Sequence, residues 1–249
     1  MNHKRKKWLL LFSLITIGVV THLILLFCGI IHINNPDSEK YPIVGVDVSS
    51  YQGTIDWETL ASQNIRFAFI KATEGSSFVD SYFEKNWSDA SETTLRVGAY
   101  HFFSFESSGD TQANLFCSTV TYVDNMLPPV IDVEYYGKYK SEKDISIFDV
   151  KNELRVLVDR ITASYGMNPI IYASKETYDT IIKEDFNNCD LWIRSVYSEV
   201  RGDIDWDFWQ YSDRHILHGY SGEERFIDMN VFFGTADEFA SYPEQKIIQ

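Results

Sequence analysis

The chain has 249 residues, of which 45% are hydrophobic and 23% charged, and its formal net charge is −14. This length allows one or two domains, and the composition is that of a globular protein rather than a disordered or fibrous one. The excess of 36 acidic over 22 basic residues argues against a nucleic-acid partner, because phosphate binding needs a net basic face. Aromatic residues make up 15%, which fits either carbohydrate binding or a large aromatic core.

The N-terminus combines a basic cluster with a long uncharged segment. Lysine and arginine fill positions 4–7, and an apolar run without Asp, Glu, Lys or Arg follows over 8–33. About 20 apolar residues suffice to cross a bilayer as a helix, and flanking basic residues stay in the cytoplasm. We therefore predict a cytoplasmic tail at 1–7, a single transmembrane anchor at 8–33, and an extracellular remainder.

A cleavable signal peptide is the competing interpretation of this segment. Its apolar core would span about 7–15 residues and end at a small-x-small cleavage site. The run is longer here, and Phe27-Cys28-Gly29 near its end offers no such site. The bulky Phe27 also argues against a lipid-modified Cys28. We expect a protein that stays in the cell membrane, with secretion after signal cleavage as the alternative.

The extracellular part is predicted to be one domain behind a short linker. Residues 34–41 are polar and lack apolar periodicity, whereas 42–249 show neither a Pro/Gly/Ser-rich break nor an internal repeat. Cys117 and Cys189 are compatible with a disulfide or with two buried thiols, and both possibilities stay open. No His/Cys/Asp cluster has metal-ligand spacing, so neither a metal nor another cofactor is expected.

Strand and helix patterns alternate along this domain. Short apolar runs bounded by turn residues predict strands at 43–48, 66–72, 95–103, 129–134, 169–173, 191–194 and 207–211. Amphipathic stretches between them predict helices at 57–63, 81–91, 111–125, 146–165 and 176–183. Such alternation predicts an α/β fold with a parallel sheet or barrel. The helical signals weaken in the last third, so a regular eighth β/α unit is not expected.

Acidic residues stand at the ends of three apolar runs. Asp47 ends the first strand, Asp132 and Glu134 end the strand at 129–134, and Asp228 ends a short run near the C-terminus. In β/α barrels the chemistry takes place where strands end and loops begin. These four acids are therefore the candidate catalytic residues.

The Asp132-Val133-Glu134 triplet is the most informative of these motifs. Residues two apart on a strand share a face, with Cα atoms roughly 6.5–7 Å apart. Two carboxylates beside an apolar core repel each other, which pushes one toward its neutral form. Enzymes that cleave glycosidic bonds use a neutral carboxylic acid as proton donor beside a charged carboxylate. Taken alone, the triplet is better explained as two exposed acids at a strand end, so the catalytic interpretation depends on the other motifs.

Other polar and aromatic residues lie within the apolar strands and are candidates for binding a saccharide. They are Lys71, Tyr100, Tyr172, Trp209 and Gln210. Aromatic faces stack on sugar rings and amides bond to hydroxyls, although ordinary packing is the alternative for each residue. We expect Lys71 to pair with one of the four acids and His101 to be a structural histidine.

Eight motifs in order resemble glycoside hydrolase family 25, the lysozyme-type muramidases. They include Gly-Val-Asp-Val-Ser-Ser-Tyr-Gln-Gly at 45–53 and Pro-Val-Ile-Asp-Val-Glu at 129–134, with further matches at 69–75, 97–102, 168–172, 191–193, 208–211 and 227–230. The resemblance covers residues 43–234. It implies an irregular, flattened TIM-like β/α barrel and hydrolysis of the β-1,4 bond between N-acetylmuramic acid and N-acetylglucosamine in peptidoglycan.

The resemblance also implies roles for individual residues. Glu134 would be the general acid, and Asp132 would stabilise positive charge at the sugar or its acetamido intermediate. Asp47 and Asp228 would orient groups or act electrostatically, and Tyr51 in the first motif joins the candidates for substrate binding. Peptidoglycan glycan strands and the membrane are the expected partners, and no protein partner is predicted.

Two other functions remain as alternatives. A non-catalytic peptidoglycan-binding or scaffold protein would be favoured by a missing acid, but all four are present. A chitinase on a related barrel would need a longer D-x-x-D-x-D-x-E pattern, which residues 128–134 do not supply. Because an anchored enzyme reaches only glycan near the membrane, we expect local remodelling or opening of the wall.

Overall fold

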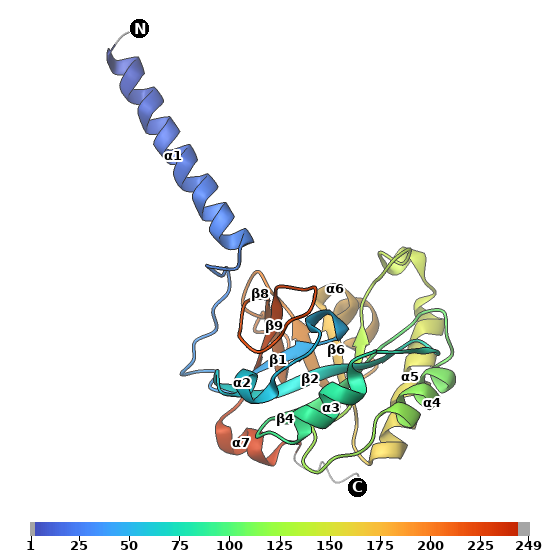
Figure 1. Cartoon of the computed structure of the whole chain (residues 1–249). Coiled ribbons are helices and arrows are strands. Elements are labelled where there is room, and N and C mark those ends of the chain that lie inside the picture. Colours follow the sequence, from blue (N-terminus) through green and yellow to red (C-terminus); the bar gives the residue numbers. More distant parts are fainter. Residues whose placement is uncertain (1–2, 244–249) are drawn as a thin grey trace.

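Helix α1 (His3–Phe27) projects away from the rest of the chain in the computed structural model, which describes residues 3–243 (Figure 1). Its stretch Lys4–Phe27 is long and apolar enough to cross a membrane, a property that N-terminal signal sequences share. The helix ends six residues before the predicted end of the anchor. Gly29 ends it, because its positive φ of 67° leaves the helical conformation.

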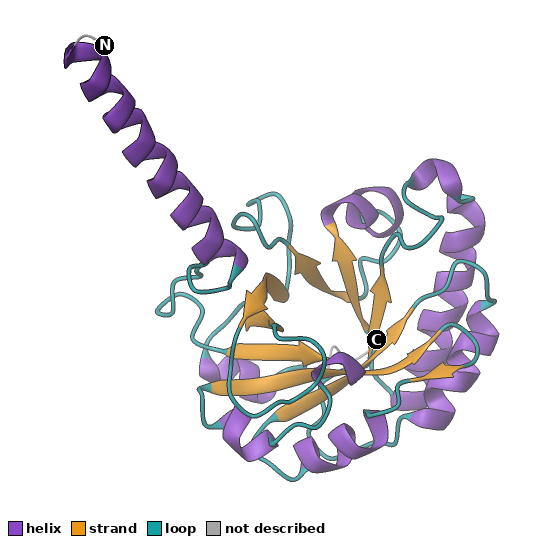
Figure 2. Cartoon of the chain, turned by 45° about the horizontal axis from the view of Figure 1, so that its top comes forward, coloured by secondary structure: helices purple, strands orange, loops and turns teal. Residues whose placement is uncertain are grey.

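The remaining chain forms a closed barrel (Figure 2). Its strands are β1 (Val44–Val48), β2 (Ile65–Glu74), β4 (Arg96–Phe102), β5 (Val130–Val133), β6 (Ile170–Ser174), β7 (Asp190–Arg194), β8 (Phe208–His215) and β9 (Ile227–Phe232), with the short β3 (Phe78–Val79) beside β2. They pair in the order β1-β9-β8-β7-β6-β5-β4-β2, and β2 returns to β1. The predicted α/β barrel is confirmed.

The barrel is irregular where the sequence pattern weakens. From β1 through β2 and β4 to β8 the neighbouring strands are parallel, whereas β9 is antiparallel to both β8 and β1. No helix separates β8 from β9 in the described chain. The expectation that a regular eighth β/α unit is missing is therefore confirmed.

Helices cover the outside of the barrel (Figure 2). They are α2 (Trp57–Ala61), α3 (Phe83–Ser91), α4 (Gly109–Thr119), α5 (Ile147–Tyr165) and α6 (Lys175–Thr177). The short α7 (Ala236–Ser241) instead packs Phe239 against Phe67 of the barrel interior, with ring centroids 5.6 Å apart. Helix α5 matches its prediction, because Ser146 caps its first turn and Gly166 ends it at a φ of 72°. Its apolar face, including Leu154, Leu157 and Ile161, is buried against the domain.

Two predicted helices differ most from expectation. The helix predicted over 111–125 ends at Thr119, since Val120 is extended and its carbonyl accepts a hydrogen bond from Tyr165 Oη. The helix predicted over 176–183 is α6 followed by a π turn (Tyr178–Ile182). Helix α7 was not predicted, although Thr235 and Glu238 form a capping box that signals its start.

Aromatic side chains fill the barrel interior below the open end. Phe69 stacks on Trp192 with ring centroids 4.5 Å apart, and Phe67 meets Phe208 edge to face at 5.3 Å. Two motif glycines make room for these rings. A Cβ at Gly45 would lie 2.4 Å from the Phe67 ring, and one at Gly98 would lie 2.7 Å from the Phe69 ring. These aromatic rings fill the barrel interior directly below the cleft.

Candidate active site

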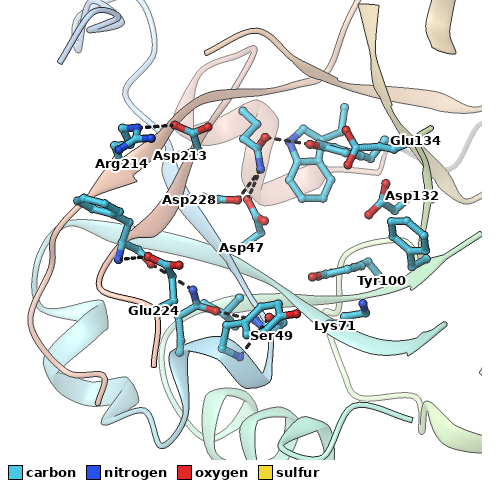
Figure 3. A pocket seen from close by; sticks show the side chains of 18 of the residues that line it. Asp47, Ser49, Lys71, Tyr100, Asp132, Glu134, Asp213, Arg214, Glu224 and Asp228 are labelled. Atoms are coloured by element: carbon cyan, nitrogen blue, oxygen red, sulfur yellow. Dashed lines mark hydrogen bonds and ion pairs between the residues drawn. The ribbon is translucent and has the colours of Figure 1, made fainter. Parts of the chain in front are cut away.

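A cleft of about 570 Å³ opens at the end of the barrel where the parallel strands finish (Figure 3). Nine of the ten residues predicted as catalytic or substrate-binding line it, namely Asp47, Tyr51, Lys71, Tyr100, Asp132, Glu134, Tyr172, Gln210 and Asp228. The sequence motifs thus converge on one site, although they lie on strands far apart in the chain.

Trp209 is the predicted residue that does not reach the cleft. It is 1% exposed, and its Nε1 donates to the Ser195 carbonyl at 3.0 Å. Successive side chains of a strand point to opposite faces, so Gln210 faces into the barrel while Trp209 points outward. The prediction of Trp209 as a substrate-binding residue is corrected accordingly.

Asp228 lines the cleft, but it does so from a different position on its strand than predicted. It lies near the start of β9 rather than at a strand end. Because β9 is antiparallel, its beginning lies beside the ends of its neighbours, and Asp228 pairs in register with Asp47 of β1. The two carboxyl groups therefore face the same side of the barrel wall.

The carboxyl groups of Asp132 and Glu134 stand where β5 ends. Asp132 is 8% exposed, and its Oδ1 has no hydrogen-bond partner among the described residues. Burial raises its pKa well above the usual range, and the neighbouring charge of Glu134 raises it further. Burial also raises the pKa of Glu134, while the cation of Arg194 opposes that rise. Together the pair retains a proton at higher pH than ordinary carboxyls do.

The other pair, Asp47 and Asp228, is held by side-chain amides. Asp47 Oδ2 accepts hydrogen bonds from Asn230 Nδ2 at 2.8 Å and Gln210 Nε2 at 3.0 Å. The same Gln210 nitrogen donates to Asp228 Oδ2 at 3.1 Å. Burial raises the pKa of both acids, and for Asp228 the charge of Asp47 adds to this effect.

Two aromatic residues fix the orientation of those amides. Tyr172 Oη donates to Gln210 Oε1 at 2.9 Å, and Trp192 Nε1 donates to Asn230 Oδ1 at 2.8 Å. Each amide oxygen is thereby occupied, so the NH₂ groups face the acids. The arrangement keeps Asp47 in one position.

Lys71 and His101 differ in how their predictions turned out. Lys71 pairs with Glu74 at 2.8 Å instead of with one of the four candidate acids, since Glu74 lies three residues along the same strand. His101 is structural as expected, because its ring nitrogens contact Thr73 Oγ1 at 2.7 Å and Gln112 Oε1 at 3.0 Å. Burial lowers the pKa of His101 to about 4.

Several cleft residues were not predicted. They include Phe27, Ser49, Gln52, Phe102, Trp192, Asp213, Arg214, Glu224 and Phe226. Asn230, which holds Asp47, could have been found because it lies two residues after Asp228 on the same face. Phe27 carried no such signal, because it lies in the apolar segment ahead of the domain.

The described part of the chain shows neither a cluster of metal ligands nor a bond between Cys117 and Cys189. No group of three or more His, Cys, Asp or Glu there is arranged to hold a metal ion. Cys117 is a thiol whose sulfur lies 3.4 Å from Ser164 Oγ, so a Cys117–Cys189 disulfide is not formed.

The chain resembles known proteins over most of its length. The family model for glycosyl hydrolases family 25 matches residues 46–220. A family 25 glycosyl hydrolase of Bacillus anthracis has a structure with 50% sequence identity and a TM-score of 0.77, covering 84% of this chain and 97% of that one. Protein YegX of Escherichia coli is 38% identical over 82% of this chain and 74% of its own length. Lysozyme M1 of Streptomyces globisporus is 31% identical over 78% and 69%.

The family match covers the barrel from β1 through β8 and therefore includes three of the four acids, with Asp228 just beyond it. The barrel, its cleft and its paired carboxyls agree with this assignment. The chain belongs to glycosyl hydrolase family 25.

Proposed function

We propose that the protein is a muramidase that hydrolyses the β-1,4 bond between N-acetylmuramic acid and N-acetylglucosamine in peptidoglycan. The observation that carries this proposal is the carboxyl pair Asp132 and Glu134 at the end of β5, inside an open cleft and with raised pKa values. The similarity to Lysozyme M1 supports the same substrate.

In this reaction Glu134 donates a proton to the glycosidic oxygen. It is the more exposed of the two acids, whereas Asp132 is almost fully buried below it. The pKa of Glu134 is raised by burial, so the group keeps its proton where an ordinary glutamate has lost it. In the reacting complex the proton shared by the pair lies on Glu134, because the positive charge that develops at the sugar or its acetamido group favours the charged form of Asp132, whose Oδ1 is unpartnered.

Asp47 and Asp228 serve as fixed electrostatic and orienting groups in this proposal. Gln210 contacts both of them and Tyr172 as well, so it links the two sides of the cleft. Further aromatic and polar groups of the cleft, Tyr51, Lys71 and Tyr100, are proposed to bind the sugar rings.

The test compares the full-length protein with Glu134→Gln on a suspension of purified peptidoglycan. The wild type should clear the suspension, and Glu134→Gln should not, because glutamine keeps the shape but has no transferable proton. Glu184→Gln is the matched control, since Glu184 is exposed and does not line the cleft, and it should behave as wild type. If wild type binds the suspension without clearing it, the protein is a peptidoglycan-binding scaffold and the muramidase proposal fails.

We also propose that α1 anchors the enzyme in the cell membrane. The division is a cytoplasmic tail at 1–7, an anchor within 8–33, a linker at 34–41 and the catalytic domain at 42–249. The length and composition of α1 support it, and the basic residues at 4–7 support a cytoplasmic N-terminus. The domain then faces the wall, where it remodels glycan near the membrane.

Fractionation of cells tests the anchor. The protein should stay in the membrane pellet after alkaline carbonate extraction, and N-terminal sequencing should find the start of the chain intact. A form that begins after Phe27 and is released into the medium would show a cleaved signal instead.

A further inference from the structure

The end of the N-terminal helix forms part of the cleft wall. Phe27 is the last residue of α1 and lies outside the segment that the family model matches, yet it lines the cleft together with Arg214 and Phe226. Its side chain is 72% exposed. An exposed aromatic ring is thus added to the cleft by a part of the chain outside the barrel.

Arg214 joins this ring to the barrel. Its guanidinium carbon lies 5.4 Å from the centre of the Phe27 ring and 5.5 Å from that of Phe226. Its Nη1 also donates to the Phe27 carbonyl oxygen at 3.3 Å. In Figure 3 Arg214 lies at the opposite end of the cleft from Glu134, with Asp47 and Asp228 between them.

The segment that follows, residues 28–34, packs onto the domain and keeps Phe27 in place. Gly29 fits so closely that a Cβ there would lie 2.4 Å from the Arg214 carbonyl oxygen. The His32 ring stacks on His215 with centroids 3.6 Å apart. Asn34 Nδ2 donates to the carbonyl oxygen of Ser195 at 2.9 Å. These contacts are spread over six residues, so the helix end is docked rather than loosely tethered.

The docked helix end also sets the height of the cleft above the membrane. With a rise of ~1.5 Å per residue, the helix from Trp8 to Phe27 is about 30 Å long, which matches the hydrocarbon core of a bilayer. Phe27 then lies at the membrane surface. This step rests on the anchor proposed above.

We propose that Phe27 is a substrate-binding residue, and that its ring, held by Arg214, binds the sugar of the glycan strand that lies nearest the membrane. A strand that extends from Glu134 past Asp228 to the helix end gains this contact, whereas a shorter one does not. Phe27 therefore makes the enzyme prefer long strands at the membrane surface over short fragments.

The test measures kcat/KM for the full-length protein in lipid nanodiscs against peptide-free glycan strands of increasing length. For Phe27→Ala we expect a loss of about three- to tenfold on the longest strands, or ~0.6–1.4 kcal/mol, and none on the shortest. Phe12→Ala is the matched control, because Phe12 is 70% exposed on the same helix and does not line the cleft. It should match wild type at every length.

Two further variants distinguish the contact between the Phe27 ring and glycan from the positioning of that ring by its neighbours. Gly29→Ala should give the same length-dependent loss as Phe27→Ala, because the added methyl displaces the docked segment without touching glycan. Arg214→Gln combined with Phe27→Ala should cost less than the sum of the two single changes, because Arg214 acts through Phe27.

Intact-mass spectrometry must show that each nanodisc sample still contains residue 27. Otherwise, proteolytic loss of the N-terminal segment could make the wild type resemble Phe27→Ala. If Phe27→Ala then equals Phe12→Ala at all strand lengths, the proposal is overturned, even if carbonate extraction supports the anchor. A released form that still contains Phe27, together with a length-dependent loss in nanodiscs, would overturn the anchor and leave the binding role of Phe27 standing. A mature form in cells that begins after Phe27 would overturn both.

Discussion

The two carboxyl pairs of the cleft are held in opposite ways. Asp47 and Asp228 face each other across β1 and β9, and amide NH₂ groups of Gln210 and Asn230 bond to them. Asp132, in contrast, leaves one buried oxygen without a partner among the described residues. The first pair is fixed before substrate arrives, whereas the second keeps an acceptor open.

This difference indicates a division of work. A buried polar atom without a partner is costly, and one that lines a cleft can be satisfied by a bound ligand. We infer that the β5 pair meets the reacting sugar and that the β1–β9 pair supplies a fixed field around it. The comparison predicts that equivalent changes in the two pairs differ in size.

The largest effect is expected at the β5 pair. Glu134→Gln and Asp132→Asn should each lower kcat by ~10²–10⁴-fold, the range that general acid catalysis contributes. Circular dichroism should show an unchanged fold for both. A retained rate above about a tenth of wild type in Glu134→Gln would remove the residue from the acid role.

A smaller loss is expected at the amide-held pair. Asp47→Asn keeps an oxygen that accepts from Gln210 and Asn230 but removes the negative charge, so kcat/KM should fall by about ten- to a hundredfold, or ~1.4–2.8 kcal/mol. Steady-state kinetics on soluble glycan would show this. A loss equal to that of Glu134→Gln would erase the distinction between the pairs.

The pH profile sharpens the same comparison. Activity should be bell-shaped, because one acid of the β5 pair must be charged and the other protonated. Since burial raises the pKa of Glu134, the alkaline limb should lie above the ordinary glutamate range. Arg194 lowers that pKa, so Arg194→Gln should move the alkaline limb to higher pH, whereas Arg194→Lys, which keeps the charge, should move it less. An unmoved limb in Arg194→Gln would assign the limb to another group.

The smallest effect concerns stability. The pKa of Asp132 is raised in the folded chain, so folding takes up a proton, and wild-type stability declines as pH rises from the ordinary carboxyl range through the raised pKa. Asp132→Asn lacks this penalty and should raise Tm at neutral pH by about 2–4 °C, the shift that ~1 kcal/mol produces in a chain of this size. The gain should vanish in acid. Calorimetry at two pH values measures both, and a lower Tm at neutral pH would contradict the inferred cost.

Sequence reasoning succeeded where local pattern decides the outcome. Strand ends carrying Asp47, Asp132 and Glu134 were predictable because acids follow buried apolar runs. The position of Trp209 was not predictable. Successive side chains of a strand point to opposite faces, and only the closed barrel shows which face lies inside. Asp228 lies at the cleft because β9 runs antiparallel to its neighbours, and no local sequence signal reveals that direction. The docking of Phe27 depends on contacts with Arg214, 187 residues away.

Mass spectrometry of the muropeptides released from purified peptidoglycan by the full-length protein tests the central claim most directly. We expect fragments that end in a reducing N-acetylmuramic acid, formed by wild type and absent with Glu134→Gln. Fragments that end in a reducing N-acetylglucosamine, or the same products from Glu134→Gln, would contradict a muramidase that works through the β5 carboxyl pair.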